Sequence, residues 1–451
     1  MHGRWVPGVT VKALGIGFLA LLMLIPLMQV RGLVHERRGL EIEARSNIAE
    51  RWGGEQIVGG PVLVVPVRSQ VHSDKGWTTQ VSRHYLLPDL LHIDATLTTE
   101  RRRYGIYETP VYIGDLAMRG QFRPEALAAL TDAGGEPVWD KAVLRVPVSD
   151  VRGIRSLSPL RIDGKELALG PGGEVAGMSA TEVAWPIDAQ RGAAPIAFSL
   201  DMRVAGTASL RFVPLARQIE VAVAAPWPDP GFKGAFLPAR HAIGASGFDA
   251  QWQVLDLNRS FGQHWQEGAL APHVLQASAF GLELYQPAGT YQRNERAGKY
   301  GILFVALTFV ALFLFDALGR WRVHPVQYLL VGLALCTFYV VLLALSEQIG
   351  FAAAYALAAI AVVTIVGGYA AAAARRRAAG GVLGALLALV YALLYGLVIS
   401  EQYSLLMGAI ALLAAVGALM YLTRGVDWYA LGPVAPPLPP VPETREPLES
   451  A

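Results

Sequence analysis

Six long apolar runs divide this chain into segments able to cross a membrane and one long stretch that is not. A bilayer core of about 30 Å needs about 20 apolar residues in a helix, and each run reaches or approaches that length. The runs are Ala13 to Val30, Tyr300 to Phe315 (extended to Leu318), Val326 to Ser346, Gln348 to Ala374, Ala378 to Ser400 and Gln402 to Thr423. We therefore predict one N-terminal membrane helix and a C-terminal bundle of five.

The first run has a basic start at Lys12, so it could instead be a cleaved signal peptide. Its apolar core is long, however, and the sequence Met28 to Arg31 that ends it lacks the small residues that the cleavage site requires. We interpret the run as an uncleaved anchor.

The stretch between the first two runs begins with a helical pattern and then changes period. Leu40, Ala44 and Ile48 recur every four residues, which predicts an amphipathic helix that ends at Gly53-Gly54. Alternation with period two follows. The clearest strands are Leu91 to Leu97, Ile219 to Val223, Phe248 to Val254 and the apolar run Val62 to Val67.

These alternating strands have one polar face, which is typical of antiparallel sheets. Pro124 to Leu130 predicts a single helix with proline at its start, and Gly170-Pro171-Gly172-Gly173 predicts a turn or loop. The fold class is therefore membrane α + β: a membrane anchor, a mostly antiparallel β domain and a helix bundle.

Only 16% of the 451 residues are charged, against about 25% in soluble chains, which agrees with lipid contact. Basic residues gather in alternate short loops of the bundle, namely Arg320 and Arg322, Arg375 to Arg377, and Arg424. The positive-inside rule then predicts that this side and both termini are cytoplasmic. The predicted domains are residues 1–31 (anchor), 32–299 (periplasmic β domain), 300–424 (bundle) and 425–451 (disordered tail).

Known chemical motifs are missing from the sequence. It has no phosphate-binding P-loop and no G-x-S-x-G nucleophile motif, and its nine histidines show no zinc-site spacing. His72, His84 and His92 would meet only if the fold brought them together. The net charge of +2 gives no case for nucleic-acid binding. We therefore predict no catalytic, metal or cofactor site and no enzyme.

The most unusual polar residues occur twice, at matching helix ends. Ser346-Glu347-Gln348 follows one bundle helix and Ser400-Glu401-Gln402 follows the helix two later. Acids at membrane depth are costly and often functional, and repeat-related sites are common in transporters. The simpler interpretation is a pair of interfacial loops in contact with water. Ser346, Glu347, Ser400 and Glu401 are therefore candidate functional residues.

Arg101-Arg102-Arg103 also has two interpretations, because it suits anionic lipid headgroups only if it faces the membrane. The simpler interpretation, a solvated strand end, is favoured.

Several segments along nearly the whole chain resemble the CreD family of inner membrane proteins. They are Arg37-Arg38 through Ala44, Ile48 to Gly53, Gly60 to Leu63, Tyr104 to Glu108, Glu295 to Ala297, Lys299 to Phe304, Leu345 to Phe351, Tyr391 to Tyr395 and Met420 to Arg424. The resemblance implies a bacterial inner membrane location and a part in envelope integrity and stress response. It implies no activity or catalytic residue.

Two functions follow from these patterns. The first is an envelope-integrity protein whose β domain binds lipid, peptidoglycan or an envelope protein. The alternative is a transporter or lipid-handling protein that uses Glu347 and Glu401. The junction residues Glu295, Arg296, Lys299 and Tyr300 are expected to couple the domain to the bundle, because they alone lead from it into the second membrane helix.

Overall fold

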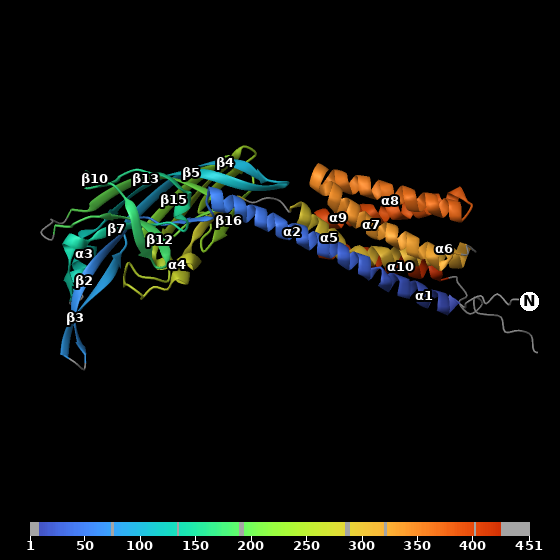
Figure 1. The fold of residues 1–451 in the computed structure, drawn as a ribbon, viewed down its shortest axis with the longest axis horizontal. Helices are drawn as coiled ribbons and strands as arrows, with labels where there is room; N and C mark the ends of the chain where they lie inside the picture. Colours follow the sequence, from blue (N-terminus) through green and yellow to red (C-terminus); the bar gives the residue numbers. More distant parts are fainter. Residues whose placement is uncertain are drawn as a thin grey trace, which may run out of the picture. The chain divides into compact units, whose positions relative to one another are not determined.

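The computed structural model describes residues 9–73, 76–132, 135–188, 194–284, 289–319, 323–400 and 403–424. The chain forms two compact units (Figure 1). The helical unit comprises residues 1–39 and 288–451, and the β unit comprises residues 40–287. The chain passes between them twice, once inside a helix and once before residue 288.

The apolar runs form the helices of the helical unit, which confirms the predicted anchor and bundle. These helices are α1 (Val9–Leu22), α2 (Leu24–Trp52, in this unit as far as Gly39), α5 (Thr290–Lys299), α6 (Gly301–Gly319), α7 (Pro325–Ile349), α8 (Phe351–Ala373), α9 (Arg377–Ile399) and α10 (Ser404–Thr423). In the described residues five helices are long and apolar enough to span a membrane, or six if the pair α5 and α6, bent by 43°, counts as one span.

Helix α7 holds the aromatic centre of the bundle. Phe338 is fully buried and contacts the rings of Tyr355 on α8 and Tyr391 on α9, with centroids 5.3 and 4.5 Å away. The lone cysteine, Cys336, is also buried on α7 and fills space in this core. Van der Waals packing of such side chains is the main force that holds helices together in lipid.

The β unit consists of three sheets, which confirms the mostly antiparallel β domain. The strands are β1 (Gln56–Val58), β2 (Val62–Ser73), β3 (Gly76–Leu86), β4 (Leu90–Tyr104), β5 (Tyr107–Phe122), β6 (Glu136–Pro137), β7 (Val143–Pro147), β8 (Ile154–Leu157), β9 (Leu160–Ile162), β10 (Lys165–Leu167), β11 (Gly170–Val175), β12 (Met178–Ala184), β13 (Ile196–Thr207), β14 (Ser209–Phe212), β15 (Gln218–Ala225), β16 (Pro230–Gly234), β17 (Arg240–Gly244), β18 (Gly247–Leu255), β19 (His264–Gln266) and β20 (Phe280–Leu284). The short helices are α3 (Pro124–Asp132) and α4 (Pro272–Ser278), with 3₁₀ turns at Trp139–Lys141, Val151–Gly153 and Asp256–Asn258.

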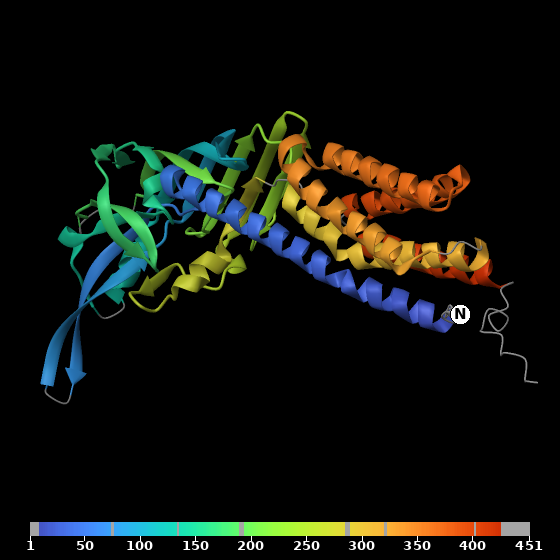
Figure 2. The same ribbon diagram turned by 45° about the vertical axis from the view of Figure 1, so that its right-hand side comes forward.

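The sheet orders are β1-β14-β20-β16, β10-β9-β13-β5-β4-β15-β18-β17 with β8 beside β13, and β11-β12-β7-β2-β3-β19 with β6 beside β2. Two pairs are parallel, β1 with β14 and β15 with β4. Figure 2 shows the β2–β3 hairpin projecting from the rest of this unit.

Burial follows the predicted alternation. In β4 the side chains of Leu91, Ile93, Ala95 and Leu97 are buried, and those between them are exposed. The predicted amphipathic helix is the C-terminal part of α2, where Ala44 and Ile48 are buried but Leu40 is 39% exposed. The helix ends at Trp52 as predicted.

The predicted loop at Gly170-Pro171-Gly172-Gly173 is wrong, because these residues begin strand β11. The strand lies at a sheet edge and pairs with β12 through an irregular register between Pro171 and Glu174. An edge strand tolerates proline, and a bulge accommodates the extra residue. The glycines allow close packing, since a Cβ on Gly173 would lie 2.7 Å from the Arg145 guanidinium.

Gly53 ends α2 in a conformation that other residues rarely adopt. Its φ is +127°, and a Cβ there would lie 2.5 Å from the Ala205 carbonyl oxygen. We expect Gly53→Ala to lower the free energy of unfolding of the β unit by at least about 2 kcal/mol. Gly105 is the control, because it has a φ of +61° in open space, so Gly105→Ala should cost only about 1 kcal/mol. Thermal unfolding of the full-length variants, followed by tryptophan fluorescence, measures both, and equal losses would contradict the close approach.

Two histidines on β3 and β19 form a stacked pair. The His84 Nδ1 lies 2.7 Å from the His264 Nε2, and the rings are tilted by only 14°. Partial burial lowers the pKa of both imidazoles, and the nearby His84 lowers the pKa of His264 further. When the pH falls below 6.5, the ordinary pKa of histidine, the unfolded chain binds protons at these two residues more readily than the folded protein does.

We therefore expect the β unit to lose stability as the pH falls below that value. The melting temperature should drop between about pH 7.5 and pH 5.5. His264→Gln should reduce the drop, whereas His273→Gln, on the exposed surface of α4, should leave it unchanged. An unaltered drop in His264→Gln would show that other groups cause it.

Candidate functional site

The predicted Ser346 and Glu347 lie in the last turns of α7, beside the short helix α5. Helix α5 buries Tyr291, Asn294 and Ala297, three residues apart, because this spacing places them on one helix face. Ser346 and Asn294 are among the few buried polar residues of the helical unit, at 2% and 4% exposure. Buried polar groups need hydrogen-bond partners, and the side chains of Ser346 and Asn294 are partners of each other.

The contacts between α5 and α7 are direct. The Asn294 side-chain amide donates to the Ser346 hydroxyl at 2.9 Å, and that hydroxyl donates to the Leu343 carbonyl at 2.8 Å. The Tyr291 hydroxyl donates to the Glu347 carboxylate at 3.0 Å. Both predicted polar residues of α7 are therefore held by α5.

The anchor helix α2 contributes arginines to the same cluster. The Arg37 guanidinium lies 3.8 Å from the Glu347 carboxylate, and Arg38 pairs with Glu295 at 2.9 Å. Arg31 donates to the Gly298 carbonyl at 3.1 Å, near the C-terminus of α5, where a positive charge is favourable. We name Arg31, Arg37, Arg38, Tyr291, Asn294, Glu295, Ser346 and Glu347 the α2–α5–α7 cluster.

A separate ion pair joins the N-terminal helix to the bundle. Lys12 of α1 pairs with Asp316 of α6, whose side chain is only 7% exposed and also accepts from the Val323 amide at 3.1 Å. The N-terminal segment is thus joined by polar contacts to α6 as well as to α5 and α7.

Of the predicted site residues that the structure describes, Ser346, Glu347 and Glu295 lie in the cluster. Glu295 and Lys299 form an ion pair at 3.1 Å, Arg296 lies half-buried on α5, and Tyr300 caps the C-terminus of α5. Ser400 caps the C-terminus of α9. Glu401 lies outside the described residues.

Sequence reasoning missed Tyr291 and Asn294 as site residues. The available signal was their spacing with Ala297 on one face of a short polar helix directly before a membrane helix. A polar residue on such a face needs a partner, but the sequence does not say that Ser346 supplies it.

The cluster is suited to holding helices together. Its carboxylates face arginine, lysine and tyrosine donors, and none of its hydroxyls lies beside a histidine. In the part of the chain that the structure describes, no group of three or more His, Cys, Asp or Glu residues could hold a metal. The three histidines considered earlier stay apart, since His84 pairs with His264, His72 contacts Trp77 and His92 contacts Asp94.

The β unit exposes a second set of polar residues on the outer face of its nine-stranded sheet. His92 lies 3.1 Å from Asp94 and 3.5 Å from Glu220, on adjacent strands. Arg203 forms two hydrogen bonds with Asp115, at 2.6 and 3.0 Å, and this contact lowers the pKa of the Asp115 carboxyl. This face is open and mixed in charge.

The arginine run at the end of β4 is engaged within its own unit. The Arg102 guanidinium stacks on the Trp52 ring at 3.8 Å and pairs with Glu100, while Arg101 lies 5.6 Å from the Trp227 ring. Arg103 pairs with Glu108. These contacts support the simpler interpretation, a solvated strand end.

A family model and a known protein sequence both match this chain, and both indicate the same family. A model of the family described as "Inner membrane protein CreD" matches residues 8–429. The inner membrane protein CreD of Escherichia coli K12 is 32% identical over 416 residues, which cover 91% of each chain. Yeast LTA4 hydrolase in complex with bestatin aligns over 78% of this chain and 69% of its own at 9% identity, with a TM-score of 0.20. That score is too low to support any inference.

Proposed function

Because the chain belongs to the CreD family of inner membrane proteins, we propose that it supports cell envelope integrity as a membrane-anchored, non-enzymatic binding protein. In this proposal the β unit binds an envelope component, such as peptidoglycan or an envelope protein. The helical unit holds the two chain segments that lead into the β unit.

The observation that carries the proposal is the α2–α5–α7 cluster. Helix α2 leads into the β unit at Gly39, and α5 follows the segment that returns from it. The cluster joins these two helices to each other and to α7, so both connections are fixed at one end of the bundle. A protein that presents a domain on a membrane platform needs such a junction.

The same cluster argues against the transporter alternative. Glu347 is satisfied by Tyr291 and Arg37, so its carboxylate already has close partners. One groove that the described residues form in the bundle, between α8 and α9, is lined by alanine, tyrosine, isoleucine, valine and threonine and includes neither Ser346 nor Glu347. Substrate paths in transporters need polar groups facing a shared cavity.

The proposed orientation has both termini in the cytoplasm and residues 32–299 in the periplasm. It is supported by Arg375 and Arg376, which lie between α8 and α9, and by Arg377 at the start of α9, at the bundle end opposite Ser346. Such arginine-rich short loops stay on the cytoplasmic side.

In the β unit, the support for a binding role is the open outer face of the nine-stranded sheet. The exposed His92, Asp94, Asp115, Arg203 and Glu220 carry both charges and donors as well as acceptors. Polar, hydrogen-bonding partners suit such a face better than lipid chains do. Edge strand β17, exposed along its whole length, offers a further place for a protein partner.

The test is to insert a flexible Gly-Ser linker directly after Lys299, where α5 meets α6. The variant is expressed in a strain that lacks its own copy of this protein. We expect loss of detergent or colicin resistance at a normal protein level, because the linker uncouples α5 from α6. The control is the same insertion at Gly105, in the open turn between β4 and β5, which should preserve resistance. Full function of the Lys299 insertion would contradict a coupling role for this junction.

A further inference from the structure

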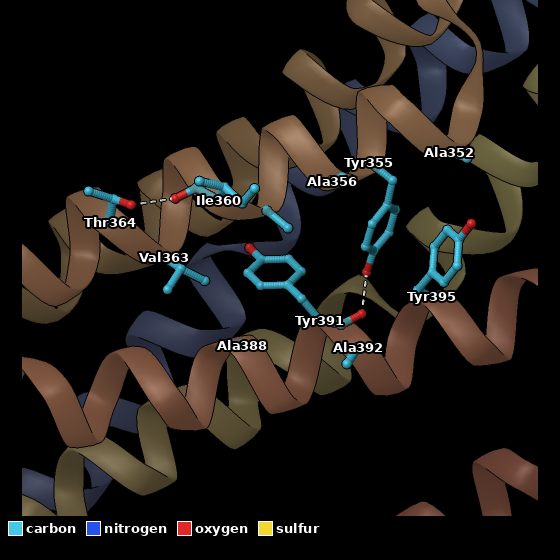
Figure 3. Close-up of a pocket in the computed structure, with 11 residues that line it drawn as sticks. Ala352, Tyr355, Ala356, Ile360, Val363, Thr364, Ala388, Tyr391, Ala392 and Tyr395 are labelled. Carbon is cyan, nitrogen blue, oxygen red and sulfur yellow. Dashed lines mark hydrogen bonds between the residues drawn. The ribbon is translucent and has the colours of Figure 1, made fainter.

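An apolar groove runs between α8 and α9 on the surface of the bundle (Figure 3). Its volume is about 540 Å³, within the range of small-molecule sites. Exposed alanines form much of its lining, among them Ala352 and Ala356 of α8 and Ala392 of α9. Three tyrosines, Tyr355, Tyr391 and Tyr395, lie along the same groove.

The length of the groove matches one leaflet of a bilayer. On α8 it extends from Ala352 in the first turn to Thr364, a rise of about 18 Å at 1.5 Å per residue. Half of a hydrocarbon core of about 30 Å is about 15 Å. The groove therefore starts near the membrane boundary, at the bundle end that carries Ser346, and reaches about the bilayer midplane.

The tyrosines leave donors in the groove. The Tyr355 hydroxyl donates to the Tyr391 carbonyl at 2.7 Å, which ties α8 to α9. Tyr391 is 95% buried, at 5% exposure, and it lines the groove with its hydroxyl toward Ile360 and Val363. The described residues provide no hydrogen-bond partner for this hydroxyl or for that of Tyr395.

An unpartnered hydroxyl at hydrocarbon depth is unfavourable unless a ligand faces it. Tyr395 lies one turn from the end of α9 at Ile399, the level at which tyrosine meets lipid headgroups. An ester carbonyl of a phospholipid lies at this boundary and accepts from a hydroxyl. Deeper in the groove, at Tyr391, a lipid chain offers only the π electrons of a double bond, a weak acceptor.

We propose that this groove binds one phospholipid, with a monounsaturated acyl chain along the alanine floor. The ester carbonyl accepts a hydrogen bond from Tyr395, and the double bond faces the Tyr391 hydroxyl. The lipid comes from the leaflet at the end of the bundle that carries Ser346. This site does not require that the β unit bind an envelope component, so the two proposals fail independently.

A second copy of the chain is the competing occupant, because small residues also favour helix–helix contact. A neighbouring helix would offer backbone carbonyls that accept a second hydrogen bond, as the Tyr391 carbonyl does from Tyr355. The length of the groove favours the lipid, because the groove matches one leaflet whereas a membrane-spanning helix of a second copy crosses both.

The experiment is native mass spectrometry of the full-length chain in nanodiscs with equal amounts of palmitoyl-oleoyl and dipalmitoyl phosphatidylethanolamine. We expect one retained phospholipid, enriched in the oleoyl species. Ala356→Phe and, from the other wall, Ala392→Phe should reduce the retained lipid about tenfold. Ala361→Phe is the matched control, because Ala361 is exposed on α8 outside the groove, and it should retain the lipid.

Tyr391→Phe should keep a lipid but lose the preference for the oleoyl species. Thermal unfolding of each variant verifies that it is folded. If either Ala356→Phe or Ala392→Phe fails to fold, the other of the two carries the test. Retention of the wild-type amount of lipid by folded groove-filling variants would overturn the proposal. So would a wild-type dimer that carries no lipid and dissociates when the groove is filled.

Discussion

Arg145→Ala is expected to lower the free energy of unfolding of the β unit by about 3–5 kcal/mol, since it breaks a largely buried ion pair. Arg145 lies on β7 with its side chain 11% exposed, and its guanidinium is 2.5 Å from the Glu182 carboxylate. It also donates to the Glu174 carbonyl at 3.0 Å and to the Tyr85 hydroxyl at 3.3 Å. Alanine leaves the Glu182 carboxylate without its arginine partner inside the seven-stranded sheet.

Chemical denaturation of the full-length protein, followed by tryptophan fluorescence, measures this loss. Arg161→Ala is the matched control, because Arg161 pairs with Glu166 at 2.9 Å but both side chains are more than half exposed. Such surface pairs contribute about 0–1 kcal/mol. If both variants lost the same stability, burial of the Arg145 pair would not explain its effect.

Glu347→Ala is expected to abolish most complementation of a deletion strain and to loosen α5 from α7. The change removes the acceptor of the buried Tyr291 hydroxyl and the partner of Arg37. Removing the acceptor of a hydrogen bond between the two helices costs about 1–3 kcal/mol, enough to detach a ten-residue helix locally. Limited proteolysis near α5 should become faster, whereas α8 and α9 should remain protected.

The control for this variant is Glu36→Ala, on the exposed surface of α2, which should retain resistance at the same protein level. Unchanged proteolysis and full resistance in Glu347→Ala would show that Tyr291 and Arg37 do not depend on the carboxylate. The proposal that the α2–α5–α7 cluster holds α5 against α7 would then be wrong.

Periodicity predicted the elements well where one face of an element meets the core. The four-residue spacing of Ala44 and Ile48 and the alternation from Leu91 to Leu97 correspond to buried faces in α2 and β4. The apolar runs correspond to helices within a few residues at each end. In these segments local pattern and tertiary burial agree, so the sequence alone is sufficient.

The prediction was wrong where glycine has a packing role rather than a turn role. Gly172 and Gly173 resemble a loop in sequence, but they allow β11 to approach Glu182 and Arg145. Arg145 lies on β7, which is distant in the sequence, and no local pattern reveals either contact. The parallel pairing of β1 with β14 joins residues more than 150 positions apart and is hidden for the same reason.

The candidate site was predicted in part. Repetition of Ser-Glu-Gln drew attention to Ser346 and Glu347, and both lie in the polar cluster. Their partners Tyr291, Asn294 and Arg37 depend on how α2 and α5 pack against α7, which periodicity does not specify.

The most direct test of the proposed role of the α2–α5–α7 cluster is complementation of the deletion strain by Glu347→Gln at matched protein level. Glutamine keeps an oxygen that accepts from Tyr291 and loses only the charge opposite Arg37, whose side chain is 45% exposed and whose pair contributes little. The proposed function therefore predicts nearly full detergent and colicin resistance for Glu347→Gln, in contrast to Glu347→Ala. Loss of resistance in a folded Glu347→Gln protein would show that the charge itself is used. That result would contradict a purely structural role for the α2–α5–α7 cluster and favour a transporter.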